Sequence, residues 1–541
     1  MSRVKITIVI SIFILAAILR LYRLDSVPPS PSLDEVSIGY NAYSILKTGM
    51  DEYKTFFPLQ LRAYDDFRPA LYIYPVALSV ATFGLNAFAV RFPSAVLSLL
   101  TVFFIYKTAQ LLGKKYFNSD SLAIWTLVFA ATSPWHIYIS RLGHEVNLGL
   151  VLFTAGAYAL FYWVVTQKKI GLYWAAIAMS LSLYGYQSEK IVLPFFGMIF
   201  AALFWRRLLS NAKVLGRVII LFTIVAMYAV VLTVSPQGLA RLHGTSATGK
   251  DAPEMVSATV VHARAVQDGD KIAAILTSKY ITAATIIVKN YTSHFSPQWM
   301  FTGSRRESHK VPDMGLFPWW GGVLILMGIW SLYKSTPKSV FFLLLAWIFT
   351  GPLPAAITTQ APHAMRAITM FPALVIAMGF GMGILAKTKL SKLLFVGLLS
   401  VLVMYQGSLF AKQYFKIFPT EQSDSFQYAL GDALRYATTY QDKYSRIVIT
   451  NEGAGYQSYM FYLFYNKFSP KQYLQDGGTN SGGYAQMHKI GKFTFEPIEQ
   501  KEQVLKDTLY ITDVTSLPEG GSILRTFMYK DGSPAMVAIS L

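Results

Sequence analysis

Residues 4–48 read VKITIVISIFILAAILRLYRLDSVPPSPSLDEVSIGYNAYSILKT, and this stretch decides the class of the fold. Residues 4–22 are almost wholly apolar and long enough to cross a bilayer, which takes about 20 apolar residues. Basic residues precede them, as in a signal sequence. No small-residue cleavage site precedes the charged run at 20–25, so we expect a retained first helix. The acidic pair Asp34–Glu35 follows just outside this span, where carboxylates near hydrocarbon are costly.

The composition extends this interpretation to the whole chain. Of 541 residues, 53% are hydrophobic and 14% are charged, with a mean hydropathy of +0.40, which indicates a polytopic membrane protein. The net charge of +19 is typical of a membrane protein with basic cytoplasmic loops. The sequence has no basic stripe with interleaved aromatic residues, so it does not indicate a nucleic-acid partner. Cysteine is absent, which excludes disulfides, thiolate metal sites and a cysteine nucleophile.

The apolar segments predict a polytopic α-helical membrane protein with about 11–13 transmembrane helices. Candidate spans are 4–22, 91–113, 121–140, 145–166, 171–187, 190–206, 214–235, 317–334, 339–358, 365–386 and 392–411. Basic clusters follow alternate spans, so the positive-inside rule places the N-terminus inside and everything after residue 412 outside. Residues 69–85 are apolar but short and contain Pro75, so they either cross or form a re-entrant element.

We therefore expect two domains. Residues 1–411 form a transmembrane domain with outward loops at 23–68 and 236–316, and residues 412–541 form a small extracytoplasmic α/β domain. In this tail, helix-like stretches near 422–440 and 456–465 alternate with the strand-like segments RIVITN and DTLYITD. ILRTFMY and AMVAIS predict a closing hairpin around Asp531–Gly532.

The first outward loop predicts a helix that begins with a capping box. Ser32 and Glu35 have the required spacing, with Leu33 as the first helical residue. One face then carries apolar side chains at helical spacing, which predicts a helix lying along the membrane surface: Leu33, Val36, Tyr40 and Tyr43. Glu35 has a structural explanation in this cap. Asp34 is not needed by the cap, although it favours the helix dipole.

Further polar groups lie at the outward ends of spans under this topology. In YDDFRPALYIY, Asp65 and Asp66 precede Arg68, and Arg is well suited to binding phosphate. The others are Arg141, His144 and Glu145 in SRLGHE, Glu189 and Lys190 in YGYQSEK, and His363 and Arg366 in TTQAPHAMR. The middle loop adds His294 in HFSPQW and Arg305, Arg306 and His309 in TGSRRESHK, where basic residues serve either anion binding or the solubility of the loop. For any one of the sites at span ends, snorkelling or an ion pair is the better explanation. Their number favours a shared polar site at the outer boundary.

Several motifs follow one another in a characteristic order: Asp-Glu opening a surface helix, then RPALYIY, AVRFPSAV, SPWHIYISR, HFSPQWMF and PHAMR. Over roughly residues 1–411 the chain thereby resembles the GT-C membrane glycosyltransferases, and most nearly the protein O-mannosyltransferases and the aminoarabinose transferases of lipid A. The resemblance implies a polyprenyl-phosphate sugar as donor and an outward-facing hydroxyl as acceptor. Asp34 matches the family's catalytic acidic residue. Arg68 matches a basic position that many members follow with two prolines, the second of which is Ala70 here.

The resemblance also implies roles for the other residues. Asp34 would be the base that activates the acceptor hydroxyl, supported by Glu35, and direct displacement would invert the anomeric centre. The leaving lipid phosphate needs positive charge, for which the candidates are Arg68, Arg141, Lys190 and Arg366. Candidates for other substrate contacts are His144, Glu145, His294 and His363. A divalent metal ion near Asp34 stays open, because the ligand spacing is not diagnostic.

Two other functions stay open at this point. A transporter or flippase of a lipid-linked sugar would use the same basic residues without needing Asp34 as a base. Against it, the polar residues gather at one face instead of the midplane, and no inverted repeat is visible. A non-catalytic membrane scaffold would leave the acidic first loop unexplained. The lack of cysteine and the bacterial style of the motifs favour a prokaryotic plasma (inner) membrane; the sugar and the acceptor, whether protein, lipid or cell-surface glycan, are not specified.

Overall fold

A computed structural model describes residues 3–64, 66–249, 251–303, 309–386, 392–480, 487–500 and 503–541. Asp65, Arg305 and Arg306 lie outside the described residues. The chain divides into two compact units: unit 1 is Met1–Leu19, Leu97–Ile139 and Val146–Ser408, and unit 2 is Arg20–Val96, Ser140–Glu145 and Leu409–Leu541. The loop that carries Asp34 and the C-terminal tail therefore belong to the same unit.

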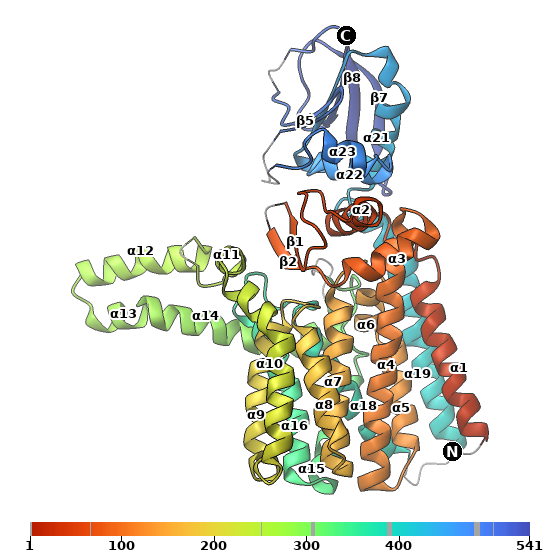
Figure 1. Ribbon diagram of the computed structural model, residues 1–541, viewed down its shortest axis with the longest axis vertical. Coiled ribbons are helices and arrows are strands. Elements are labelled where there is room, and N and C mark those ends of the chain that lie inside the picture. Colours follow the sequence, from red (N-terminus) through yellow and green to blue (C-terminus); the bar gives the residue numbers. More distant parts are fainter. Residues whose placement is uncertain are drawn as a thin grey trace. The chain divides into compact units, whose positions relative to one another are not determined.

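Unit 1 is a bundle of apolar helices that run side by side (Figure 1). Its helices are α1 (Arg3–Leu21), α4 (Ala87–Phe117, which begins in unit 2), α5 (Ser121–Thr132), α6 (Pro134–Ser140), α7 (Val146–Thr166), α8 (Ile170–Ser182), α9 (Glu189–Leu209), α10 (Ala212–Val234), α15 (Gly321–Ser335), α16 (Lys338–Thr350), α17 (Leu353–Ala356), α18 (Phe371–Leu385) and α19 (Lys392–Lys412, which ends in unit 2). Among the described residues, 7 helices, or up to 8 with one bent pair, are long and apolar enough to cross a membrane. The multi-pass helical class is thus confirmed, while the number of crossings stays a prediction.

Two predicted segments differ in detail from simple spans. The span expected at 121–140 is broken into α5 and α6, which meet at an angle of 54° just before Pro134; proline interrupts helical hydrogen bonding. The segment at 69–85 contains α3 (Ile73–Phe83), whose 11 residues reach only roughly 17 Å, too short for a full crossing. The middle loop folds into α11 (Pro236–Thr245), α12 (Pro253–Gln267), α13 (Lys271–Leu276) and α14 (Lys279–Ser293).

Unit 2 joins the first outward loop to the tail. The loop forms α2 (Leu33–Thr48), the antiparallel pair β1 (Gln60–Ala63) and β2 (Asp66–Pro69), and α3. The tail contains α20 (Phe418–Glu421), α21 (Tyr428–Thr439), β3 (Arg446–Thr450), α22 (Ser458–Tyr465), α23 (Pro470–Gln475), β4 (His488–Ile490), β5 (Phe493–Glu496), β6 (Thr508–Asp513), β7 (Ser522–Met528) and β8 (Pro534–Ser540).

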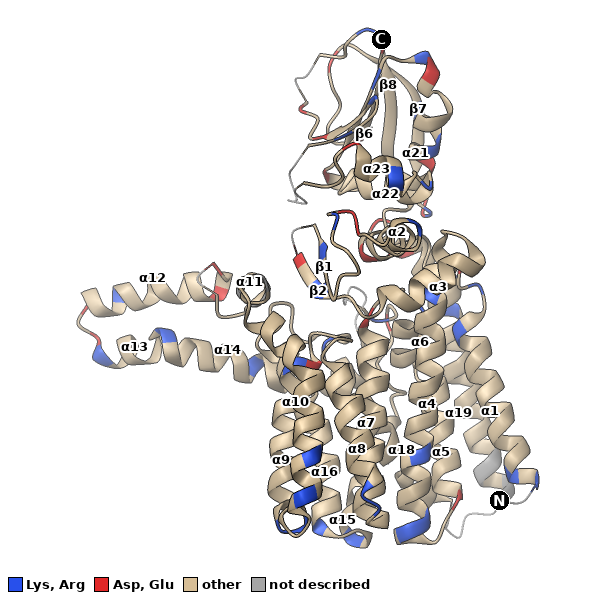
Figure 2. Cartoon of the chain, in the orientation of Figure 1, with Lys and Arg blue, Asp and Glu red and all other residues tan. Residues whose placement is uncertain are grey.

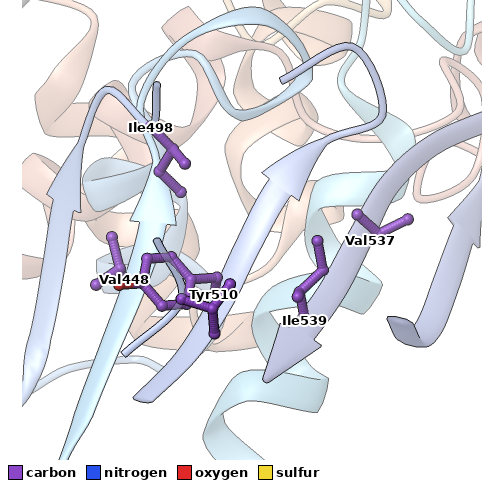
Figure 3. Packing of buried hydrophobic residues seen from close by; sticks show 6 residues of the cluster. Val448, Ile498, Tyr510, Val537 and Ile539 are labelled. Carbon is purple, nitrogen blue, oxygen red and sulfur yellow. The ribbon is translucent and has the colours of Figure 1, made fainter. Parts of the chain in front are cut away.

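The tail is the small α/β domain that the sequence predicts. Its six strands have the order β4-β5-β3-β6-β8-β7, with β3 parallel to β5 and β6 at the centre. The predicted closing hairpin is confirmed as antiparallel β7–β8. Figure 3 shows part of the core, where Val448, Tyr510, Val537 and Ile539 pack together on three strands. Central parallel strands are buried on both faces, which explains the run of apolar residues in β3.

The helix α2 begins as predicted but is more deeply buried. Ser32 and Glu35 form the capping box, and Gly49 ends the helix in the left-handed conformation with φ 76°. Val36 and Tyr40 of the expected face are buried, but so are Ile38 and Asn41, which point elsewhere around the helix, whereas Leu33 and Tyr43 are only partly buried. The one-sided amphipathic pattern is therefore a wrong description. The helices α3, α22 and α23 cover α2, and the sequence of α2 carries no sign of these contacts.

Candidate active site

The capping box sends the two acidic residues in different directions. Successive residues of an α-helix are rotated by about 100°. Glu35, the third helical residue, turns back over the helix start, where its Oε2 atom accepts from the Ser32 N–H at 2.7 Å. Asp34 therefore points elsewhere, and 48% of its side chain is exposed, whereas that of Glu35 is buried.

Glu35 is held by a buried arginine from the start of α4. Its Oε1 atom accepts from Arg91 Nε and from the Gly143 N–H, both at 2.7 Å, and its Oε2 atom accepts from Arg91 Nη2 at 3.0 Å. The remaining N–H groups of Arg91 donate to the carbonyls of Leu24, Pro28 and Ser30. The five donors of the guanidinium and the four acceptor positions of the carboxylate are all used. This pair fixes α2 to the preceding segment and to the turn that contains Gly143.

Asp34 lies between a basic side chain and a histidine. Its Oδ1 atom is 2.9 Å from Arg68 Nη1, and its Oδ2 atom is 3.7 Å from His144 Nε2. The Nδ1 atom of His144 is in turn 3.1 Å from Glu145 Oε2. Arg68, His144 and Glu145 are mostly shielded from solvent, while Asp34 is half exposed. In the row of side chains Arg68–Asp34–His144–Glu145, only the carboxylate of Asp34 is thus accessible to solvent, and the others are largely buried.

Arg68 is positioned by the small β1–β2 hairpin. It lies opposite Leu61 in the register, and Tyr64, at the turn of the hairpin, donates from its hydroxyl to the Leu33 carbonyl at 3.0 Å. This bond ties the hairpin to the first residue of α2, next to Asp34. Burial alone would lower the pKa of Arg68, but the carboxylates of Asp34 and Glu145 outweigh it and raise the pKa above its ordinary value. The guanidinium stays charged and is suited to an anion.

Arg141 has structural partners. Its guanidinium donates to the carbonyls of Arg20, Arg23 and Val27 and, at 3.2 Å, to the hydroxyl of Tyr414. The side chain is fully buried, and burial lowers its pKa despite the neighbouring Tyr414. These contacts join the N-terminal segment, the turn at 141–145 and the segment before α20. They favour a structural role for Arg141 over the phosphate-binding role expected from the sequence.

A second buried carboxylate, Glu52, connects α2 to the tail. Its Oε1 atom accepts from Asn41 Nδ2 at 3.0 Å, and its Oε2 atom accepts from Thr479 Oγ1 at 2.7 Å and from the Tyr459 hydroxyl at 3.2 Å. Backbone bonds reinforce the connection: the Glu52 N–H donates to Asn41 Oδ1, and the Thr479 N–H donates to the Glu52 carbonyl. Burial raises the pKa of Glu52 to about 7.

The other predicted residues lie in unit 1, where two of the histidines meet. His294 Nδ1 is 2.7 Å from the Asn290 carbonyl, which only accepts, so this nitrogen carries the proton. Its Nε2 atom accepts from the His363 N–H at 3.1 Å. Burial lowers the pKa of His294 to about 4 and that of His363 well below its ordinary value. Both side chains are therefore neutral at pH 7, and His294 links Asn290 to the backbone of His363. Arg366 follows in the same loop and donates to Thr358 Oγ1 and the Thr359 carbonyl, each at 2.8 Å.

Lys190 lies at one end of an apolar groove in unit 1. The groove has a volume of about 640 Å³ and is lined by α8, α9 and α10. Along α9 it runs from Lys190 to Leu208, which corresponds to roughly 27 Å, most of a bilayer core. Lys190 is the one charged residue among its described lining residues. The preceding Glu189 is anchored by Thr369, whose hydroxyl donates to Glu189 Oε1 at 3.1 Å.

The structure brings together some of the predicted residues. Unit 2 contains Asp34, Glu35, Arg68, Arg141, His144 and Glu145, and unit 1 contains Lys190, His294, His363 and Arg366. The prediction did not include Arg91 or Glu52. Arg91 lies in AVRFPSAV, where an arginine within an apolar span was a usable signal; Glu52 gave none. Among the described residues, no group of three or more His, Asp or Glu is arranged to hold a metal ion.

Comparisons with known proteins connect this geometry to a family. Residues 68–230 match the family model of dolichyl-phosphate-mannose-protein mannosyltransferase. No curated protein matches the chain. Among solved structures, the fold is similar to ArnT from Cupriavidus metallidurans bound to undecaprenyl phosphate, with 9% identity, 99% of this chain and 98% of that chain covered, and a TM-score of 0.57.

Two other solved structures have lower TM-scores. AglB from Archaeoglobus fulgidus, in complex with an inhibitory peptide and a dolichol-phosphate, is 11% identical over 85% of this chain and 63% of that chain, with a TM-score of 0.49. The Pmt1–Pmt2 protein O-mannosyltransferase complex of S. cerevisiae is 17% identical over 44% of this chain and 33% of that chain, with a TM-score of 0.33. These two scores are too low to support an argument. Residues 68–230 thus match a glycosyltransferase family, and the chain shares the GT-C type of membrane fold with ArnT.

Proposed function

We propose that this enzyme transfers a sugar from a polyprenyl-phosphate donor to a hydroxyl of an extracytoplasmic acceptor, with Asp34 as the base. The observation that carries the proposal is the half-exposed Asp34 carboxylate between Arg68 and His144. An acceptor hydroxyl needs a carboxylate that substrate can reach, and the buried, fully bonded Glu35 offers none. Glu35 is instead the residue that positions Asp34.

The transfer is a single displacement. The acceptor oxygen forms a bond to the anomeric carbon, the bond from that carbon to the phosphate oxygen breaks, and Asp34 takes the hydroxyl proton. The polyprenyl phosphate leaves with the electron pair, and the guanidinium of Arg68 stabilises its charge. One displacement inverts the anomeric centre. His144, whose Nε2 atom is 3.7 Å from Asp34 Oδ2 and whose Nδ1 atom is 3.1 Å from Glu145 Oε2, completes the polar surroundings of the base.

The lipid carrier is supported by two observations of different kinds. The groove between α8, α9 and α10 is apolar along a length suited to a prenyl chain, and Lys190 lies at one end of it. The similar ArnT structure contains undecaprenyl phosphate. We further propose the topology that the sequence predicts, with the N-terminus inside a prokaryotic cell membrane and unit 2 on the outer side.

The test compares purified wild type with Asp34→Asn, which keeps the size of the side chain but removes the base. The control is Asp432→Asn, an equally exposed carboxylate of unit 2 in a surface ion pair with Arg435. With a polyprenyl-phosphate sugar and an extract of surface polymers, release of free polyprenyl phosphate should fall about 10²–10⁴-fold for Asp34→Asn alone. Equal release of polyprenyl phosphate by all three proteins would refute the assignment of Asp34 as the base. Movement of donor across vesicle bilayers without any release would favour a flippase.

A further inference from the structure

A basic cleft lies between α4 and α7 in unit 1, apart from the residues proposed for transfer. It has a volume of about 370 Å³. Its α4 wall carries Lys107, Lys114 and Lys115, which share one helix face at spacings of seven and eight residues. Its α7 wall carries Tyr158 and Tyr162, one turn apart. Figure 2 shows that basic residues gather at this end of α4, α9 and α16.

The cleft has an excess of positive charge. None of the described residues that line it is acidic. Lys114 is 3.7 Å from Asp120, but it is 57% exposed and shares this carboxylate with Lys5. Lys107 is hydrogen-bonded at 3.2 Å to Gln110, which is neutral. An ammonium group inside an apolar span calls for an anionic partner.

Snorkelling does not fully account for Lys107. The predicted span of α4 ends at residue 113, six residues after Lys107, which is roughly 9 Å along the helix axis. An extended lysine side chain reaches only about 6 Å, so its ammonium stays below the end of the span. A partner that reaches into the cleft would satisfy it.

The same face of α4 becomes apolar beyond the cleft. Leu100 and Phe103 are 46% and 40% exposed, and they precede Lys107 by seven and four residues. Exposed apolar side chains in a membrane helix face acyl chains. One face of α4 is therefore apolar at Leu100 and Phe103 and becomes basic toward the end of the helix. An anionic lipid has the same arrangement, because its apolar chain leads to a charged head group.

We propose that this cleft is a binding site for the phosphate head group of a membrane lipid, with the lipid chain along Leu100 and Phe103. The phosphate lies among Lys107, Lys114 and Lys115 and accepts hydrogen bonds from the hydroxyls of the two tyrosines. The site should prefer a lipid phosphate to a soluble phosphate, because the apolar part of the α4 face adjoins the basic part and can contact a lipid chain. The cleft and the proposed donor groove share no lining residue: on α7 the groove contacts Leu160, whereas the cleft contacts Tyr158 and Tyr162, two residues away on either side and so on the opposite helix face.

The experiment measures lipid binding to the purified, delipidated full chain by native mass spectrometry. The cleft variant is Lys107→Gln/Lys114→Gln/Lys115→Gln. The control is Lys168→Gln/Lys169→Gln/Lys213→Gln, which removes the same charge from the loop before α8 and from the first turn of α10, outside the cleft. Probes are phosphatidylglycerol, a polyprenyl phosphate, phosphatidylcholine and inorganic phosphate.

Phosphatidylglycerol should bind the cleft variant roughly 100-fold more weakly than wild type, from the usual contribution of each basic residue, while the control binds as wild type does. Polyprenyl phosphate should lose only the part of its binding that is additional to the donor groove. Lys107→Gln alone should weaken binding roughly fivefold, and it keeps the proposal testable if the triple variant does not fold. Equal loss in cleft and control variants would overturn the site. Equal binding of phosphatidylcholine, or displacement by inorganic phosphate at concentrations similar to those of the lipid, would overturn its lipid specificity. Preference between phosphatidylglycerol and polyprenyl phosphate identifies the lipid.

Discussion

Replacing Glu52 by Gln is expected to remove a pH-dependent loss of stability from unit 2. Glu52 is fully buried, and burial raises its pKa from 4.5 to about 7. The folded protein therefore binds a proton that the unfolded chain releases between these two values. The stabilisation is fully present below pH 4.5 and is lost as the pH rises through about 7.

The magnitude follows from the two pKa values. Their difference corresponds to about 3 kcal/mol in the free energy of unfolding of unit 2. The amide of Glu52→Gln can accept from Asn41 and donate to the hydroxyl oxygens of Tyr459 and Thr479, so it imitates the protonated acid. The variant should match wild type at pH 4.5 and be more stable by about 3 kcal/mol at pH 8.5. Asp51, Tyr40, Tyr64 and Tyr473 also face this carboxylate and remain unchanged.

The assay is hydrogen exchange of the α22 amides in detergent micelles, which reports on opening of this part of the chain. A local readout is needed because His294, in unit 1, acts with the opposite sign. Its pKa of about 4 means that its stabilisation is present above pH 6.5 and lost as the pH falls through about 4. Glu519→Gln, at an exposed carboxylate of the tail, is the control. If the difference between Glu52→Gln and wild type is the same at pH 4.5 and 8.5, the reasoning fails.

Three further substitutions test individual contacts. Arg68→Lys keeps the charge but loses the planar fork, so the KM for the donor should rise about tenfold, with a smaller change in kcat; an unchanged KM would contradict a phosphate contact. Glu35→Ala leaves the buried Arg91 without its carboxylate and should cost about 3–5 kcal/mol in urea unfolding, whereas a cost under about 1 kcal/mol would mean the pair is not buried in solution. His294→Phe removes two hydrogen bonds and should cost about 2 kcal/mol at pH 7 while flattening the acid limb of the unfolding curve below pH 6; a limb that keeps its slope would assign the titration to another group.

Local sequence patterns predicted much of unit 2, including the start of α2. The capping box, β3, β6 and the β7–β8 hairpin each depend on residues close in sequence, so they were accessible. The strands β4 and β5 were not, because His488–Ile490 and Phe493–Glu496 are too short to show an alternation.

The roles of the arginines were less accessible, for a physical reason. Arg68, Arg91 and Arg141 look alike in sequence, since each lies within or directly beside an apolar segment. Only the tertiary contacts separate them: Arg91 and Arg141 donate to backbone carbonyls of residues 20–30, and Arg68 pairs with Asp34. Backbone carbonyls leave no mark in the sequence, so a structural arginine and one suited to a phosphate could not be distinguished there.

The adjacent acids of α2 provide a last test of this division of roles. The double variant Asp34→Glu/Glu35→Asp keeps the charge and composition but exchanges the side-chain lengths. At position 35 the carboxylate would withdraw by about one carbon–carbon bond, roughly 1.5 Å. Its present distances of 2.7 Å to Arg91 Nε and to the Gly143 N–H would then exceed hydrogen-bonding range.

At position 34 the longer carboxylate would have to fold back to keep its contact with Arg68, which is 2.9 Å away. Because a displacement of about 1 Å can cost about 10²-fold in rate, transfer should fall by at least that factor. Each single change should account for part of the loss, with Glu35→Asp also lowering the free energy of unfolding and Asp34→Glu leaving it near wild type. A double variant that is as active as wild type would mean that the two acids are interchangeable, and the separation of base from positioning residue would then be wrong.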